Sequence, residues 1–382
     1  MAAKSAPTCV GLDIGTSGIR AVQLTWKRKT RTYSVAKAAS VELPRGAVRN
    51  GAVVDQAVVA KALKKLWRKG HFSTRKVVIG LADSSILTRQ VDLPWMPPDD
   101  FRAALRYQVA DALPVDLTSV EIDYHLLEER PATDANGQPV DTNRILVVAA
   151  NSEAVTAEAA ATRKARLQPM RADSAAFALI RAVCGGVLPT DTAAAAIVDI
   201  GADQLTVVVH QAGQPRFIRT ISNLGGETAT ASVAERLDVP LEEAEQIKRD
   251  AGLNGPAPVV APIAESSVFG GMTTPDMIPM DNKLATAVAV LNPWATTLIG
   301  EIRNSLDYFA ATDPSTPIQS LTVTGRTAQL EGIVDRLSTQ LPVPVTVLDQ
   351  FAGLRASRAV RKHASTDSRL AVATGLAMGE TS

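Results

Sequence analysis

The sequence predicts an α/β protein of two related lobes, because one short motif opens each half of the chain. Residues 10–16 read VGLDIGT and residues 196–202 read AIVDIGA. In both places an apolar run ends in Asp-Ile-Gly, and a second β-rich run follows at residues 19–24 and 205–210. Each motif is typical of a strand, a tight turn and a returning strand. A chain of 382 residues suits two lobes, since domains of roughly 150 to 200 residues are common.

The first half predicts a lobe that carries a small inserted subdomain. Residues 32–41 and 76–82 have the pattern of strands, and residues 54–69 that of an amphipathic helix. From about residue 76 to 150, strands at 86–93, 121–127 and 144–150 surround a helix between Pro97 and Pro114. This order predicts a β-α-β-β insertion. Helices are expected at 152–166 and 170–183, and the first lobe at 1–184.

The second half, residues 185–382, predicts the second lobe with a helical subdomain at about 225–318. After a strand at 216–221, helices are expected to about 237, then from Pro240 to Gly252, then at 285–309. A strand at 321–324, a helix at 328–341, a strand at 343–348 and a small-residue helix at 370–378 follow. The Pro-, Gly- and Ser-rich segment 255–281 is too long for an ordinary connection, and the sequence assigns it no role.

Composition argues against several classes of function. The net charge is +1 and aromatic residues are 4%, which disfavours nucleic-acid binding and base stacking. Two cysteines, Cys9 and Cys184, exclude a disulfide framework. No apolar run reaches the ~18 residues of a membrane span, residues 1–8 do not resemble a signal peptide, and residues 378–382 are no amphipathic anchor. We expect a cytoplasmic protein that reaches a membrane only through a partner.

The repeated hairpins have the chemistry of a phosphate clamp. Glycines at the turns, Gly15 and Gly201, let backbone N–H groups approach phosphate oxygens, because no Cβ intervenes. The carboxylates at the strand ends, Asp13 and Asp199, can hold Mg²⁺ through its waters. Two such hairpins that face each other would hold a triphosphate from both sides.

Three phrases in this order, DIGT at 13–16, DIG at 199–201 and VTG at 323–325, resemble the actin-like ATPase superfamily. Within it, residues 86–94 with 99–114, LGGE at 224–227 and EEAEQIK at 242–248 resemble the family of type IV pilus assembly protein PilM. The resemblance covers most of residues 8–378 and implies an actin-like ATPase fold. The cell-division protein FtsA is similar to this family and is the competing match.

The resemblance implies an ATP and Mg²⁺ site. Its residues would be Asp13, Gly15, Thr16 and Ser17 in the first phosphate loop, Asp199, Gly201 and Ala202 in the second, Gly225 and Gly226 close to the nucleotide, and Gly325 against the adenine. The metal would be held by Asp13 and Asp199. The helices at 172–182 and 370–378 resemble the crossing pair that hinges the two lobes.

Two further positions leave alternatives open. Glu245 and Lys248 are three residues apart and share a helix face. The resemblance places this helix near the ribose and adenine, whereas spacing alone favours a surface ion pair. Members of the family usually have two adjacent glycines where this chain has Gly325 and Arg326. Arg326 would either stack on the base as a planar cation or obstruct the pocket.

The sequence favours a nucleotide-dependent scaffold with at most slow ATPase activity, because no residue that orients an attacking water is identifiable. A sugar kinase shares the Asp-Ile-Gly-Thr turn but needs a carboxylate base, and Asp83 and Asp173 look structural. An FtsA-like filament protein would normally carry a C-terminal amphipathic helix. The four histidines, 71, 125, 210 and 363, show no metal-binding spacing.

The resemblance implies a partner as well, namely the short cytoplasmic N-terminus of a PilN-type inner-membrane protein, with other pilus assembly proteins nearby. Its groove would lie between the first lobe and the insertion, where Leu93, Trp95 and Met96 are candidate contacts. Trp95 would be either an exposed anchor or part of the subdomain core. Self-association and the identity of the pilus machine stay open.

Overall fold

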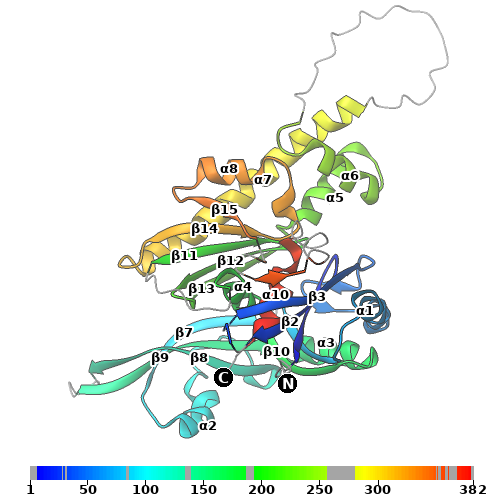
Figure 1. The fold of residues 1–382 in the computed structure, drawn as a ribbon. Helices are drawn as coiled ribbons and strands as arrows, with labels where there is room; N and C mark the ends of the chain where they lie inside the picture. Colours follow the sequence, from blue (N-terminus) through cyan, green and yellow to red (C-terminus); the bar gives the residue numbers. More distant parts are fainter. Residues whose placement is uncertain are drawn as a thin grey trace, which may run out of the picture.

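A computed structural model describes residues 7–27, 29–30, 32–82, 86–133, 139–185, 193–255, 280–349, 351, 354–357, 360 and 368–379. Its two large sheets repeat one topology (Figure 1). The first sheet has the order β10-β6-β1-β2-β3-β16. Its strands are β1 (Pro7–Gly15), β2 (Gly18–Lys27), β3 (Thr32–Glu42), β6 (Lys76–Leu81), β10 (Gln168–Ser174) and β16 (Arg355–Ala356).

The second sheet has the order β13-β12-β11-β14-β15. Its strands are β11 (Ala194–Ile200), β12 (Gln204–Gln211), β13 (Gln214–Ser222), β14 (Ile318–Thr324) and β15 (Val345–Val347). In both sheets the opening strand pairs antiparallel with the returning strand and parallel with a strand from later in the lobe. This shared order confirms the predicted duplication, and the predicted two-lobed α/β fold with it.

The insertion is a separate three-stranded sheet with one helix. Strands β7 (Ile86–Pro94), β8 (Val120–Thr133) and β9 (Pro139–Asn151) pair in the order β7-β9-β8, and α2 (Pro98–Gln108) packs its Phe101 and Leu105 into their core. The predicted β-α-β-β order is confirmed. The predicted start at residue 76 is wrong, because β6 pairs with β1 and β10 in the first sheet.

Helices α1 (Gln56–Gly70) and α3 (Ser152–Lys164) pack side by side against the first sheet (Figure 1). Asp55 begins α1, since its carboxylate accepts hydrogen bonds from the N–H groups of Ala57 and Val58. The short hairpin of β4 (Val48–Arg49) and β5 (Ala52–Val53) precedes it. Leu63 and Leu66 of α1 are fully buried in the core of this lobe.

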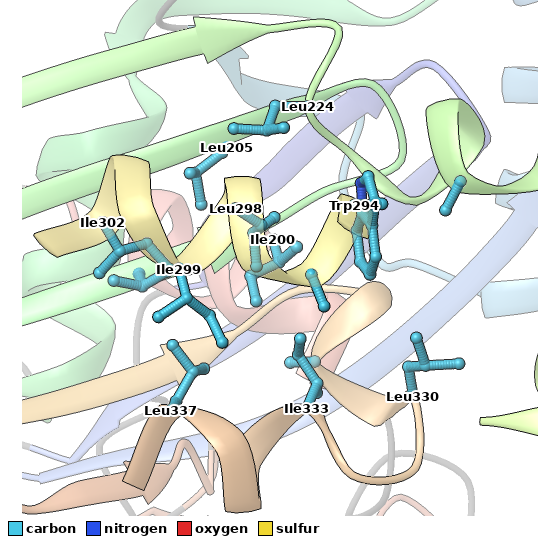
Figure 2. Packing of buried hydrophobic residues seen from close by; sticks show 14 of the residues in the cluster. Ile200, Leu205, Leu224, Trp294, Leu298, Ile299, Ile302, Leu330, Ile333 and Leu337 are labelled. Atoms are coloured by element: carbon cyan, nitrogen blue, oxygen red, sulfur yellow. The ribbon is translucent and has the colours of Figure 1, made fainter. Parts of the chain in front are cut away.

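The second lobe is covered by α5 (Gly226–Leu237), α6 (Leu241–Ala251), the long α7 (Met280–Thr312) and α8 (Ile333–Gln340). Figure 2 shows Trp294, Leu298 and Ile302 of α7 packed between the sheet and α8. The predicted helix at 328–341 is in fact a 3₁₀ turn (Thr327–Gln329) followed by α8. Most of the segment 255–281 lies outside the described residues.

Two short helices, α4 (Ala175–Val183) and α10 (Ala371–Met378), pack against each other between the sheets (Figure 1). Helix α4 follows the first sheet but contacts β12 and β13 of the second, whereas α10 follows the second sheet but contacts β1 and β2 of the first. The sequence predicted this crossing pair. It did not predict that residues 355–356 and 371–378 rejoin the first lobe, through β16 on β3 and α10 on β1.

The predicted helix at 170–183 is wrong for residues 170–174. Residues 168–174 form β10, which pairs parallel with β6, and only the remainder is helical. Ser174 marks the boundary, because its hydroxyl caps the helix by accepting from the N–H groups of Ala176 and Phe177.

We expect the folded state to lose stability in acid because of the buried His210 in β12. It is 5% exposed, and within the described part of the chain neither ring nitrogen has a hydrogen-bond partner. Burial lowers its pKa below the ordinary value of 6.5, so the unfolded chain binds a proton first as the pH falls. We therefore expect stability to be lost as the pH falls below about 6.5. His210→Leu should reduce this loss in urea denaturation above and below that pH.

The exposed His71 at the end of α1 supplies the control. It has a left-handed backbone, which asparagine tolerates, so His71→Asn removes a histidine without strain. This variant should keep the wild-type pH dependence. An unchanged pH dependence in His210→Leu would contradict the assignment.

Candidate functional site

The two repeated turns face one cavity between the lobes. Asp13 and Gly15 from the end of β1, and Asp199 and Gly201 from the end of β11, all line a cavity of about 90 Å³. Of the other predicted site residues, the same cavity is lined by Thr16, Ser17, Ala202, Gly325 and Arg326. Segments that are almost two hundred residues apart in sequence therefore meet as the duplication implied.

A wider cavity of about 620 Å³ adjoins the first and shares Ser17, Ala202 and Arg326 with it. Gly226, Glu245 and Lys248 lie in its wall. Gly225 lines neither cavity. A Cβ there would lie 2.3 Å from the Ala202 oxygen, so this glycine packs against the second turn.

Backbone hydrogen bonds fix the second turn to the start of α5. The Gly201 N–H donates to the Gln204 oxygen at 2.9 Å, and the N–H groups of Gly226 and Glu227 donate to the oxygens of Gly201 and Ala202 at 3.1 and 2.7 Å. The Thr327 hydroxyl donates to the Gly201 oxygen at 2.9 Å. The N-terminus of α5 therefore stands at the cavity, where a helix dipole favours negative charge.

An arginine that sequence reasoning missed lies under the first turn. Arg20 is the cross-strand neighbour of Asp13 in the β1–β2 hairpin, and its Nη1 lies 3.4 Å from Asp13 Oδ2. Its guanidinium also donates to Ser17 Oγ at 3.2 Å and to the Gly18 oxygen at 3.3 Å. Burial raises the pKa of Asp13, and the Arg20 charge and hydrogen bond oppose this. The register of the predicted hairpin was the signal that could have found Arg20.

Glu158 of α3 is a second residue that the sequence did not single out. It is 3% exposed and its Oε1 has no hydrogen-bond partner among the described residues. Burial raises its pKa well above the ordinary value, and the Asp13 charge adds to this. A lone glutamate on a buried face of Ala154, Ala159 and Ala161 was the available signal.

Lys248 is buried and Glu245 is partly buried, so the alternative of a surface ion pair is wrong. Lys248 is 6% exposed and donates to Glu245 Oε2 at 2.6 Å, Thr230 Oγ1 at 2.8 Å and the Gly226 oxygen at 3.0 Å. Burial alone would raise the pKa of Glu245, but the Lys248 charge, hydrogen bonds from Lys248 and Thr230, and Arg326 bring it to about 2. The network ties α6 to the start of α5.

Arg326 turns toward this network. Its Nη2 lies 3.3 Å from Glu245 Oε1, and the side chain lines both cavities. Residue 325 must be glycine, because φ is +97° and a Cβ would meet the Ile200 oxygen at 2.4 Å. Residue 326 has an ordinary right-handed backbone with φ −62° and accepts a side chain there. The arginine that stands where a second glycine was expected therefore fits, because its backbone is ordinary and its side chain pairs with Glu245.

Removing Lys248 should destabilise the fold more than removing a surface lysine. Lys248→Met removes one of three cations from the partly buried Glu245 and takes a buried donor from the oxygens of Thr230 and Gly226, and we expect a loss of about 2 kcal/mol. The matched control is Lys283→Met, because Lys283 pairs with the half-exposed Glu243. Pairs of that kind contribute about 0.5 kcal/mol. Equal losses for the two variants in urea denaturation would contradict the structural role of Lys248.

The candidate partner contacts differ in exposure, and the described candidate aspartate has a structural role. Leu93 is a core residue of the insertion at 5% exposure and Met96 packs on that core, so Leu93 is not available as a contact. Trp95 is 49% exposed, so it is an exposed side chain and not part of the subdomain core. Asp173 is held by Arg181 of α4 and Arg171, a structural role as expected. Asp83 and His363 lie outside the described residues.

The described residues contain neither a cluster of metal ligands nor a helix suited to a membrane. Histidines, cysteines and carboxylates do not gather there in groups of three or more that could hold a metal ion. Within the same residues, every helix is too short or too polar to cross a membrane.

Comparison with known proteins agrees with the fold. The family model described as "Type IV pilus assembly protein PilM" matches residues 11–267 and 282–381. A solved structure described as a PilM–PilN type IV pilus biogenesis complex is 22% identical, covers 97% of this chain and 98% of that one, and has a TM-score of 0.77. The ethanolamine utilization protein EutJ from Carboxydothermus hydrogenoformans is 17% identical over 98% and 90% of the two chains, with a TM-score of 0.51. The chain has the actin-like fold and belongs to the PilM family of type IV pilus assembly proteins.

Proposed function

We propose that this chain binds ATP with Mg²⁺ between its lobes and serves as a cytoplasmic scaffold of type IV pilus assembly. In this role it holds the N-terminal tail of a PilN-type inner-membrane protein. The observation that supports nucleotide binding best is that Gly15 and Gly201, which open the two lobes, line the same cavity.

The residues present fit a nucleotide. The wide cavity of about 620 Å³ lies in the usual range of roughly 300–1,000 Å³ for small-molecule sites, and the small cavity beside it is lined by both glycine turns. We assign the polyphosphate to the small cavity and the nucleoside to the wide one, near Glu245, Lys248 and Arg326. Gly325 lines the small cavity and not the wide one, so this assignment places it beside the polyphosphate and not against the adenine as expected from the sequence. Mg²⁺ would offset phosphate charge, with Asp13 and Asp199 as its carboxylates through water.

The same geometry supports slow turnover. Asp13 is engaged by Arg20, and the partly buried Glu245 is held by three cations, Lys248, Arg249 and Arg326. These carboxylates are thus occupied in ion pairs and poorly placed to act as general bases. Nucleotide would then act mainly by setting the angle between the lobes, across the α4–α10 contact.

Two observations support a PilN-type partner: the family to which the chain belongs and an exposed tryptophan on the insertion. The similar solved structure is a PilM–PilN complex whose chain is matched over almost its whole length. In this chain, Trp95 directly after β7 is a large exposed aromatic on the insertion, beside the proposed groove. An exposed tryptophan of this kind is a frequent anchor for a partner.

Adding a single methyl group to either glycine turn tests whether both turns bind the same polyphosphate. A Cβ at Gly15 would meet the flexible Arg20 side chain at 2.8 Å, and one at Gly201 would lie 3.0 Å from the Gln204 oxygen. Both variants should therefore fold, while the methyl groups obstruct the phosphate cavity. We expect Gly15→Ala and Gly201→Ala each to weaken an ATP analogue with Mg²⁺ at least about tenfold by calorimetry, a change of ~1.4 kcal/mol.

A glycine far from the site provides the control for this measurement. A methyl group added at Gly300 in α7 would meet no neighbouring atom within 4 Å, so Gly300→Ala should bind like the wild type. If one turn variant lost affinity and the other bound normally, the two turns would not share a ligand, and the proposal would fail.

A further inference from the structure

The outer edge of the first lobe carries a concentrated positive surface. Between residues 56 and 76 the chain has seven Lys or Arg and no Asp or Glu, although the whole protein has a net charge of only +1. This stretch forms α1 and the start of β6, and α3 lies beside it (Figure 1). The positive charge is therefore segregated onto one face and does not follow from composition.

Four of these cations, together with Arg166 after α3, line one cavity of about 510 Å³. We call them the basic surface; its members are Lys61, Lys64, Arg68, Arg75 and Arg166. All five are exposed, and within the described residues none forms an ion pair. Arg163 and Lys164, in the last turn of α3, are also exposed and extend the charge toward α3. Unpaired cations gathered at this density repel one another and are stabilised by an anionic partner.

The floor of this cavity is apolar. Trp67, Ala165 and Leu167 line it, and Leu167 is 5% exposed. The indole of Trp67 is fixed, since its Nε1 donates to the Thr74 oxygen at 3.1 Å and its ring packs on Phe72 with centroids 4.8 Å apart. Trp67 is the one aromatic ring among these lining residues, whereas proteins that bind single strands stack successive bases on several rings. An apolar floor under a cationic rim instead matches an amphipathic anion.

We propose that the basic surface binds directly to an anionic phospholipid bilayer. Phosphate groups of such a leaflet form a diffuse negative plane, and each lysine or arginine near it contributes favourably. The cations come from α1, from Arg75 just before β6 and from the turn after α3. Residues 56–76 contain no acidic side chain that would orient one defined ligand among these cations. Binding would be peripheral, consistent with the finding for the described helices above.

Sedimentation with vesicles tests this proposal on the full chain without nucleotide or partner, so a negative result leaves the proposed function standing. We expect the wild type to bind vesicles of phosphatidylcholine with phosphatidylglycerol, not vesicles of phosphatidylcholine alone, and to be released by high salt. Lys61→Glu with Lys64→Glu should reduce binding at least about tenfold, because each cation adds to the surface attraction. Both positions are mid-helix, and thermal melting checks the fold.

The matched control reverses two exposed lysine or arginine charges elsewhere, Lys29→Glu with Arg236→Glu. This variant has the same net charge and should bind as the wild type. Equal loss in both double variants would show a net-charge effect and overturn the assignment of the surface. Equal binding to both kinds of vesicle, or binding to polyglutamate or duplex DNA in place of vesicles, would overturn the lipid assignment, as would full competition by free inorganic phosphate.

Discussion

Replacing Gly375 by alanine is expected to cost at least about 3 kcal/mol of unfolding free energy, a loss at the upper end of overpacking effects. Gly375 lies in α10, where that helix crosses α4. A Cβ at this position would stand 1.7 Å from the oxygen and 2.4 Å from the carbonyl carbon of Ala178. These are backbone atoms of α4 and cannot rotate away, so the helices would have to separate.

The separation would reach beyond the two helices. The Gly375 oxygen also accepts a hydrogen bond from Arg181 Nε of α4 at 3.0 Å. Since α10 packs on the first sheet and α4 contacts the second, moving them apart loosens the contact between the lobes. The nucleotide site proposed above lies in that contact, so Gly375→Ala should weaken nucleotide binding as well as stability.

Urea denaturation compares this variant with Gly300→Ala, the control introduced above. Alanine in an open helix position is neutral or stabilises by up to about 1 kcal/mol. We therefore expect the two substitutions, identical in chemistry, to have opposite effects. Similar small effects would show that α4 and α10 can adjust without cost, and the close crossing would not be a structural requirement.

The fold was predictable where its signal is local. Each Asp-Ile-Gly hairpin contains both of its strands and its turn within one short segment, residues 7–27 and residues 194–211, and adjacent strands of this kind pair by sequence pattern alone. The insertion was predictable for the same reason, since prolines bound its helix. The motif residues that line the cavity, such as Gly15 and Gly201, were predictable because each hairpin fixes its own turn.

The errors concern pairing between distant segments. Most of strand β10 was predicted as helix because residues 170–183 are rich in small residues, namely Ala172, Ala175, Ala176 and Ala178. Only its parallel partner β6, far away in sequence, makes it a strand. The return of α10 to the first lobe was missed for a similar reason, since a short apolar helix carries no mark of the sheet that it will cover.

The site residues that were missed act through packing. Thr230 is fully buried and links Lys248, Glu245 and the Gly226 oxygen, but a threonine within a helix has no motif around it. Thr327 holds the second turn in the same way from the segment after β14. Their roles follow from the contact of α5 with α6 and with the second sheet, which no local pattern reports.

Substituting the paired aspartates should have the largest effect on ligand binding. Asp13 and Asp199 end equivalent strands and line one cavity. If both hold Mg²⁺ through its waters, removing either leaves the metal and the polyphosphate without half of their carboxylate support. Losing a side chain that holds a metal through its waters costs roughly 10–100-fold in metal affinity. We expect either substitution to weaken binding by about 100-fold or more.

These variants should remain folded. Burial already disfavours the charge of Asp13, and without it Arg20 keeps two acceptors, Ser17 Oγ and the Gly18 oxygen. Asp307 on the exposed side of α7 provides a matched aspartate outside the site, and Asp307→Ala should leave both stability and binding unchanged.

Calorimetric titration of an ATP analogue, with and without Mg²⁺, against the wild type, Asp13→Ala, Asp199→Ala and Asp307→Ala is the most direct measurement of the shared site. We expect Mg²⁺-dependent binding by the wild type and by Asp307→Ala, and none by either site variant while thermal melting shows both to be folded. Wild-type affinity in Asp13→Ala and in Asp199→Ala would contradict a single polyphosphate site built from both lobes.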